Sequence, residues 1–215
     1  MRRTRIKICG LTTIAGIEAA VEAGVDALGF VFSESPRRLS PRGAAELARA
    51  IPRFVSKVAV FFGADGTEIA RTLEIFPADL VQTEPVIGLE IRVPLLPVFH
   101  DDGDILNHVL DTTEPDGTVL LEAPGRGGRG VSPSWERAAS IARRRRLVLA
   151  GGLTPDNVAD AIAQVRPFAV DVSSGVETEG GVKDAALIRA FVHAVRATDE
   201  DRSHQRGGED VACKC

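Results

Sequence analysis

Eight short apolar runs recur along the chain and alternate with stretches whose apolar residues follow a helical period. The runs lie at 5–8, 27–32, 57–61, 80–82, 95–99, 118–121, 147–150 and 169–172. The helical pattern covers 13–23, 41–50, 66–76, 134–144, 154–164 and 184–197. Two further connections carry a weak helical pattern around 86–92 and a short one around 104–110. Strand, helix and strand repeated in this way indicate parallel strands joined by right-handed crossovers.

A closed (β/α)8 TIM barrel is the α/β architecture that this pattern favours, because barrel strands are buried on both faces. The competing arrangement is a doubly wound open sheet. Its support is Gly125-Arg126-Gly127-Gly128-Arg129-Gly130, which has the spacing of a dinucleotide-binding loop after a strand. Against it, Val131-Ser132-Pro133 follows in place of a helix, and no carboxylate suited to a ribose stands about twenty residues further on. We therefore expect the barrel.

The domain organisation follows from length and pattern. At 215 residues and 44% hydrophobic, the chain suits one domain with a full core. We expect the barrel to occupy residues 1–197. The tail 198–215 shows no apolar period and is predicted to be disordered. Inside the barrel, Ser40-Pro41 and Thr154-Pro155 each offer a hydroxyl N-cap followed by proline, which predicts helix starts there.

Charge and cysteine content narrow the classes of partner. The 26 basic and 30 acidic residues give a net charge of −4, and only Arg143–Arg146 cluster, which we interpret as a solvated helix end. We therefore expect no nucleic acid partner. No run is long enough to span a membrane and no secretory apolar region is evident, so a cytoplasmic protein is expected. Cys213 and Cys215 lack the further ligands that zinc needs, so no metal is expected.

Three side chains at strand ends are candidates for chemistry, because residues that end barrel strands point into the mouth where loops form the site. Cys9 ends the first strand before a glycine turn, where a helix dipole favours a thiolate, although a small buried thiol is the alternative. Glu122 closes the sixth strand, and a solvated loop glutamate is equally simple. Asp171 lies inside an apolar strand, where a charge is costly unless it is paired or functional.

Two glycine-containing loops follow the seventh and eighth strands. Gly151-Gly152 and Ser173-Ser174-Gly175 lie where barrels often hold a phosphate, since glycines let backbone amides approach an anion and hydroxyls add donors. Tight turns alone would also use glycine. Arg37, after the second strand, has the fork geometry to pair with a substrate carboxylate.

Taken together, these motifs resemble one family from about residue 5 to 195. The matching segments are Lys7-Ile8-Cys9-Gly10-Leu11-Thr12, Ala27 to Phe32 with Ser35-Pro36-Arg37, Val60-Phe61, Gly127-Gly128-Arg129-Gly130 with Trp135, Ala150 to Val158, and Asp171 to Glu177 with Gly181 to Asp184. They are similar to phosphoribosylanthranilate isomerase of tryptophan biosynthesis in order, spacing and position at strand ends.

The resemblance implies a cofactor-free Amadori rearrangement of N-(5-phosphoribosyl)anthranilate. It implies that Cys9 removes the proton from the sugar C2, and that Glu122 protonates the ring oxygen. The family has Leu-Leu-Asp at the latter position, so Glu122 carries an extra methylene. Gly128 would contact the substrate from the glycine-rich segment. A second departure is Val81-Gln82-Thr83-Glu84-Pro85, where the family reads Gln-Leu-His-Gly.

Two other functions stay open from the sequence. One is a noncatalytic or altered-substrate barrel that binds a phosphosugar, and the other is a nicotinamide-dependent oxidoreductase built on the glycine segment. The expected partner is a small phosphosugar, bound by a monomer or a homodimer.

Overall fold

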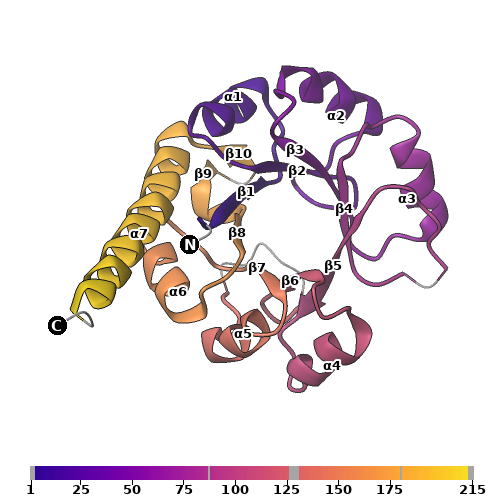
Figure 1. Cartoon of the computed structure of the whole chain (residues 1–215). Coiled ribbons are helices and arrows are strands. Elements are labelled where there is room, and N and C mark those ends of the chain that lie inside the picture. Colours follow the sequence, from indigo (N-terminus) through magenta and orange to yellow (C-terminus); the bar gives the residue numbers. More distant parts are fainter. Residues whose placement is uncertain (1–2, 87, 126–130, 180, 213–215) are drawn as a thin grey trace.

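The computed structural model shows a closed barrel of eight parallel strands, neighbours in chain order, with helices around the outside (Figure 1). The structure describes residues 3–86, 88–125, 131–179 and 181–212. The strands are β1 Arg5–Cys9, β2 Ala27–Val31, β3 Ser56–Val60, β4 Leu80–Thr83, β5 Leu95–His100, β6 Thr118–Glu122, β7 Arg146–Leu149 and β8 Ala169–Val172. The expected TIM barrel is confirmed, and each strand lies within one or two residues of the run that predicted it. An open sheet is excluded because the strands pair in chain order from β1 to β8 and β8 pairs with β1, which closes the sheet.

Helices follow most of the strands. They are α1 Ile14–Glu22, α2 Pro41–Leu47 extended by the 3-10 turn η1 Ala48–Ala50, α3 Gly66–Leu73, α4 Ile105–Thr112, α5 Trp135–Ala142, α6 Val158–Val165 and α7 Ala185–Ala212. A short hairpin, β9 Glu177–Glu179 and β10 Val182–Lys183, follows the 3-10 turn η2 Ser174–Val176. Among the described residues, no helix combines the length and the apolar character that crossing a bilayer requires.

The structure agrees with one expected helix start, differs at another, and has no helix among the described residues between β4 and β5. Ser40 caps α2 as expected, because its hydroxyl accepts the Gly43 N–H with Pro41 in the first turn. Thr154 does not cap α6. That helix begins at Val158 after Asn157, whose side chain instead accepts the Thr154 N–H and stabilises a preceding turn. Between β4 and β5 the described residues form no helix, in keeping with the prolines and glycine of that connection.

The strands sort their side chains by alternation. One face packs against the helices in a large apolar cluster that includes Ile6, Ile8, Phe30 and Phe61. The other face fills the barrel with two smaller clusters made up almost entirely of strand residues. The first contains Cys9, Val31, Val58 and Val60, and the second contains Leu96, Val98, Leu120, Val148, Ala150 and Ala169. By the same alternation Lys7, Glu122 and Asp171 point inward, into an otherwise apolar interior.

Helix α7 runs past residue 197, where the sequence analysis places the end of the barrel. It packs against α1 and α6 and continues to Ala212. The Asp199 carboxylate accepts the Thr4 N–H at 2.6 Å and the Thr4 hydroxyl at 2.8 Å. This contact joins the two ends of the barrel domain. A helix already formed extends by one hydrogen bond per residue, so it runs on without an apolar stripe.

The Thr4 to Asp199 contact predicts where truncation begins to cost stability. A chain that ends after Asp201 should melt within about 2 °C of the full chain, whereas one that ends after Ala197 loses both hydrogen bonds. Hydrogen bonds to a charged group contribute about 1.5–3 kcal/mol net, and here one carboxylate near the end of the chain makes both, so we expect a loss of about 2 kcal/mol and a fall of roughly 4–8 °C. Thermal unfolding of the two truncations measures this difference. Equal melting temperatures would contradict the role given to Asp199.

Candidate active site

The carboxyl ends of the strands surround a small cavity of about 70 Å³ at the barrel mouth. Nearly all of the predicted site residues line it: Cys9, Arg37, Glu122, Gly151, Gly152, Asp171, Ser173, Ser174 and Gly175. Gly128 lies outside the described residues. Side chains that are distant in the chain, from β1, β6 and β8, therefore converge as the barrel topology requires.

Cys9 is the C-terminal residue of β1 and is only 7% exposed. Its neighbour across the β1–β2 ladder is Gly29. A Cβ atom at Gly29 would lie 2.9 Å from Cys9 Sγ and 3.1 Å from Lys7 Nζ, so the absence of a side chain there makes room for both groups. The thiol and the ammonium thus share one space inside the barrel.

Lys7 and Asp171 form an ion pair between adjacent strands. They are register partners on β1 and β8, and Lys7 Nζ donates to the two carboxylate oxygens at 2.9 and 3.0 Å. Each side chain is only 5% exposed. Burial disfavours the Lys7 ammonium, but the charges of Asp171 and Cys9 outweigh this, and the pKa of Lys7 is raised. Asp171 therefore has the pairing that its place in an apolar strand demanded, and it also borders the cavity.

The acidity of Cys9 corrects the expectation of a helix-stabilised thiolate. Burial raises the pKa of the thiol, and the charge of Asp171 acts in the same direction. The positive charges of Lys7 and Lys183 oppose this shift. Helix α1 begins only at Ile14, beyond the turn, so its dipole is not adjacent to the sulfur. Lys7 and Lys183, and not the helix, are the groups that favour the thiolate.

Glu122 is not a solvated loop residue. It is the last residue of β6, its side chain is 9% exposed, and no described residue makes a hydrogen bond to its Oε2. Burial, reinforced by the charge of Asp171, raises the pKa of Glu122 to about 7. A large fraction of this carboxyl is therefore protonated near neutral pH and able to donate a proton into the cavity.

Arg37 lines the cavity, but its fork is already occupied. Its Nε and Nη2 donate to the two carboxylate oxygens of Glu177 at 2.8 and 2.6 Å. Glu177 also accepts from Lys183, which donates in addition to the Ser173 carbonyl at 3.1 Å. The free bidentate fork that was expected for a substrate carboxylate is thus corrected to a protein ion pair. Glu177 orients Arg37 and leaves its Nη1 side for a ligand.

The two glycine-containing loops after β7 and β8 touch one another. Gly151 and Gly152 have φ of 88° and 61°, which favour glycine. A Cβ atom at Gly175 would overlap the carbonyl oxygen of Leu153, so this glycine allows the loops to meet. Ser173 Oγ donates to the Cys9 carbonyl at 3.1 Å, which links these loops to the end of β1. The arrangement places glycine and serine backbone beside the cavity, as an anion site requires.

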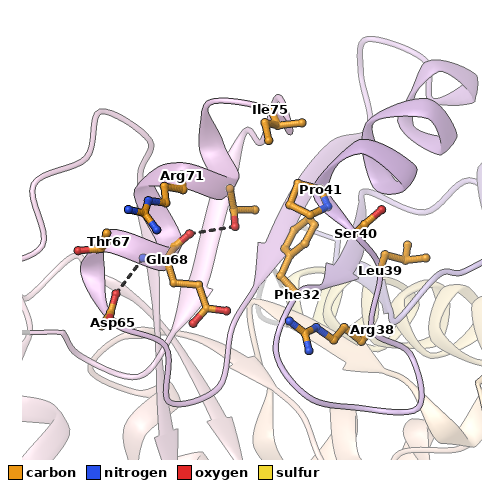
Figure 2. A pocket seen from close by; sticks show the side chains of 11 residues that line it. Phe32, Arg38, Leu39, Ser40, Pro41, Asp65, Thr67, Glu68, Arg71 and Ile75 are labelled. Atoms are coloured by element: carbon orange, nitrogen blue, oxygen red, sulfur yellow. Dashed lines mark hydrogen bonds between the residues drawn. The ribbon is translucent and has the colours of Figure 1, made fainter.

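A larger cavity of about 610 Å³ lies outside the barrel, between α2 and α3 (Figure 2). Phe32 and Pro41 lie on one side of it and the first turn of α3 on the other, and Arg38 and Glu68 are among its lining residues. Its charged lining residues are of both signs and are solvent-exposed. It contains none of the predicted site residues, all of which, apart from Gly128, line the cavity at the barrel mouth.

Sequence reasoning missed three charged residues of the site: Lys7, Glu177 and Lys183. All three fall inside motifs that were recognised, yet no role was assigned to them. Lys7 carries the same signal that identified Asp171, a charge in an apolar strand, and it shares the inward parity of Cys9. The Glu177 contacts depend on hairpin geometry and have no comparable signal.

A sequence model of the N-(5'-phosphoribosyl)anthranilate isomerase family matches residues 6–194. The chain belongs to this family. The isomerase of Pseudomonas paraeruginosa is 42% identical over 213 residues, which cover 94% of this chain and 100% of the relative. Monomers of the dimeric phosphoribosylanthranilate isomerase from Thermotoga maritima superpose with a TM-score of 0.80 at 32% identity, over 90% of this chain and 99% of theirs. A complex of phosphoribosylanthranilate isomerase with reduced 1-(o-carboxyphenylamino)-1-deoxyribulose 5-phosphate gives a TM-score of 0.77 at 33% identity, with the same coverage.

The buried ion pair of this isomerase-family barrel predicts a large effect of removing one partner. Lys7→Met leaves Asp171 buried and unpaired, and such a loss typically costs about 3–5 kcal/mol. The double variant Lys7→Met/Asp171→Leu should recover part of that loss, because both charges are gone. Urea unfolding of the single and double variants measures the coupling. Additive losses would show that the two side chains do not depend on one another.

Proposed function

We propose that the protein converts N-(5'-phosphoribosyl)anthranilate to 1-(2-carboxyphenylamino)-1-deoxyribulose 5-phosphate in tryptophan biosynthesis, without a cofactor. The observation that carries the proposal is that Cys9 and Glu122 border one cavity, and that Glu122 has a pKa of about 7. The reaction needs a base and an acid at one substrate, and the site supplies one of each. Family membership and the relative complexed with the reduced product support this reading.

The proton movements follow from the two groups. Glu122 donates its proton to the furanose ring oxygen, the bond from that oxygen to C1 breaks, and a protonated imine (iminium ion) forms between C1 and the anthranilate nitrogen. Cys9, as the thiolate, then takes the C2 proton, and the electron pair left on C2 forms the C1–C2 double bond and neutralises the iminium ion to give the enolamine. Proton transfer to C1 and loss of the C2 hydroxyl proton yield the ketone. The cycle closes when the thiol proton is returned, through solvent, to Glu122.

The remaining residues hold the substrate. We assign the phosphate to the backbone of Gly151, Gly152, Ser173, Ser174 and Gly175, where the two loops meet. Arg37, oriented by Glu177, supplies a positive charge for the anthranilate carboxylate through its remaining donors. Asp171 keeps Lys7 protonated beside Cys9, and this ammonium offsets part of the burial cost of the thiolate. Gly128 stays a proposed contact.

Other functions have less support. A noncatalytic phosphosugar-binding barrel would not need a carboxyl whose pKa is close to neutral beside a buried thiol. A nicotinamide-binding loop places a helix directly after its glycines, whereas α5 begins at Trp135, after the proline-containing segment. We further propose a cytoplasmic location and a monomer or homodimer.

The function is tested by the loss of substrate fluorescence with purified protein and phosphoribosylanthranilate. Wild type should consume the substrate without added cofactor, and Cys9→Ala should reduce kcat to background while the melting temperature changes little. The matched control is a Cys213→Ala/Cys215→Ala double variant, which should keep full activity. Near-normal turnover by Cys9→Ala would remove the thiol from the mechanism, and no turnover by wild type would exclude the substrate.

The acid role of Glu122 predicts linked changes in rate and stability. Glu122→Gln should lower kcat by about 10² to 10⁴ with little change in KM. In wild type kcat should fall as the pH rises through about 7, because the acid must carry its proton. The pKa of Glu122 is raised from its ordinary 4.5, so the folded wild type should lose stability between about pH 4.5 and 7, a loss that Glu122→Gln avoids. Rate profiles and urea unfolding at pH 5 and 8 measure both effects, and a flat rate profile would contradict them.

The contact between the two loops predicts a specific glycine effect. Gly175→Ala forces a Cβ atom against the Leu153 carbonyl and pushes the loops apart, so KM should rise at least about tenfold, as should the inhibition constant of inorganic phosphate. Gly103→Ala is the matched control, since its added Cβ meets no atom within 4 Å. Steady-state kinetics with inorganic phosphate as inhibitor measures KM and the inhibition constant for both variants. Unchanged phosphate inhibition in Gly175→Ala would place the anion elsewhere.

A further inference from the structure

The connection from β6 to α5 begins at Glu122 and must be held if that carboxyl is to keep one direction. No described residue forms a hydrogen bond to Glu122 Oε2. Packing and the backbone therefore orient this side chain. The fixed points of the connection, and not direct contacts of the carboxyl, decide where its proton is delivered.

Asp101 follows β5 directly and ties down both ends of this connection. Its backbone N–H donates to the Glu122 carbonyl at 2.9 Å. Its carboxylate, only 1% exposed, accepts the Ser134 N–H at 2.6 Å. The same carboxylate accepts Arg137 Nε at 2.6 Å and Nη2 at 2.8 Å. Ser134 is the N-cap of α5, so one residue joins the start of the connection to the helix that ends it.

Both ends of the connection also pack on the loop after β7. A Cβ atom at Gly151 would lie 3.0 Å from the Ala123 N and 3.1 Å from the Val131 carbonyl oxygen. If the connection moved where it meets α5, it would separate from the loop after β7 and admit water beside Glu122. The carboxyl would then lose both its position and the burial that keeps it protonated.

We propose that Asp101, held by Arg137, is a positioning residue for Glu122 in the isomerase reaction. The inference rests on the proposed function. Asp101 does not line the cavity, so it acts through Glu122 and the connection and not on the substrate. We call the bonds from the Asp101 carboxylate to Ser134 and Arg137 the Asp101 clamp. A displacement of about 1 Å at a reacting group can cost about a hundredfold in rate, and the clamp prevents a shift on that scale.

The charged groups that face Glu122 come from four other elements: Lys7 of β1, Glu84 after β4, His100 of β5 and Asp171 of β8. Asp171 and Glu84 raise the pKa of Glu122, and His100 and Lys7 lower it, but burial has the largest effect. Hydration of the carboxyl should therefore move its pKa down from about 7, toward its ordinary 4.5.

Two variants break the clamp, and the barrel supplies a matched control for each. Asp101→Asn keeps the shape but cannot accept both Arg137 donors, and Arg137→Gln removes the fork from a half-exposed side chain, so it should fold. Asp26 makes the same kinds of bond at the opposite end of the barrel, accepting the Arg3 guanidinium and the Ile6 N–H. Asp26→Asn and Arg3→Gln therefore measure the structural loss alone.

The test combines kinetics with a ¹³C NMR titration of the Glu122 carboxyl, assigned by its absence in Glu122→Gln. We expect Asp101→Asn to lower kcat by about 10- to 100-fold with KM within about threefold. The pH at which its kcat falls on the alkaline side and the midpoint of the Glu122 titration should both decrease by about one pH unit. Arg137→Gln should give smaller changes in the same direction. The Asp26→Asn and Arg3→Gln controls should keep the kcat and titration of wild type.

Values for Asp101→Asn that match those of Asp26→Asn would overturn the positioning role. If wild type does not turn over the substrate, the proposed function fails, and the titration still decides the clamp. A Glu122 titration that is unchanged in Asp101→Asn would then overturn the inference by itself.

Discussion

A buried ion pair between the first and last strands is the interaction on which this site depends. Lys7 and Asp171 are register partners across the β1–β8 junction, where the barrel closes, and each is almost fully excluded from water. Two charges in such surroundings are stable only together. The pair therefore links the two strands at the closure, and Asp171 raises the pKa of the Lys7 ammonium beside Cys9. The same contact supports the fold and, in the proposed mechanism, favours the thiolate of Cys9.

Exclusion of water raises the pKa of both Glu122 and Cys9, but the consequences for their proposed roles are opposite. Burial raises the pKa of Glu122 to about 7 and so keeps an acid protonated. Burial also raises the pKa of Cys9, which disfavours the thiolate that the reaction needs. Positive charge is accordingly concentrated on the thiol side, where Lys7 and Lys183 face Cys9. In the proposed mechanism, burial alone keeps Glu122 protonated, whereas a thiolate at Cys9 needs compensating positive charge.

Much of the fold could be predicted because barrel strands are continuous apolar runs, and strand ends converge by topology alone. Cys9 and Glu122 were predicted by this route and Asp171 by its charge inside an apolar run, and all three line the cavity. Contacts between residues far apart in the chain could not be found. The Arg37 fork is taken by Glu177, 140 residues away, and α7 is anchored through Asp199 and Thr4, 195 residues apart. Local patterns carry no trace of either contact, so neither could be predicted from the sequence.

As the proposed acid, the Glu122 side chain at the end of β6 has to be restricted more by its surroundings than a shorter aspartate would be. An additional methylene adds a rotatable bond, and each rotamer carries the proton to a different place. The site does not restrict Oε2 with a hydrogen bond, since such a bond to the charged form would also lower the pKa and weaken the acid. Restriction has to come from the backbone on either side of Glu122, where Asp101 binds the carbonyl and the start of α5. A buried acid that must stay unpaired is held in place by contacts one residue removed from it.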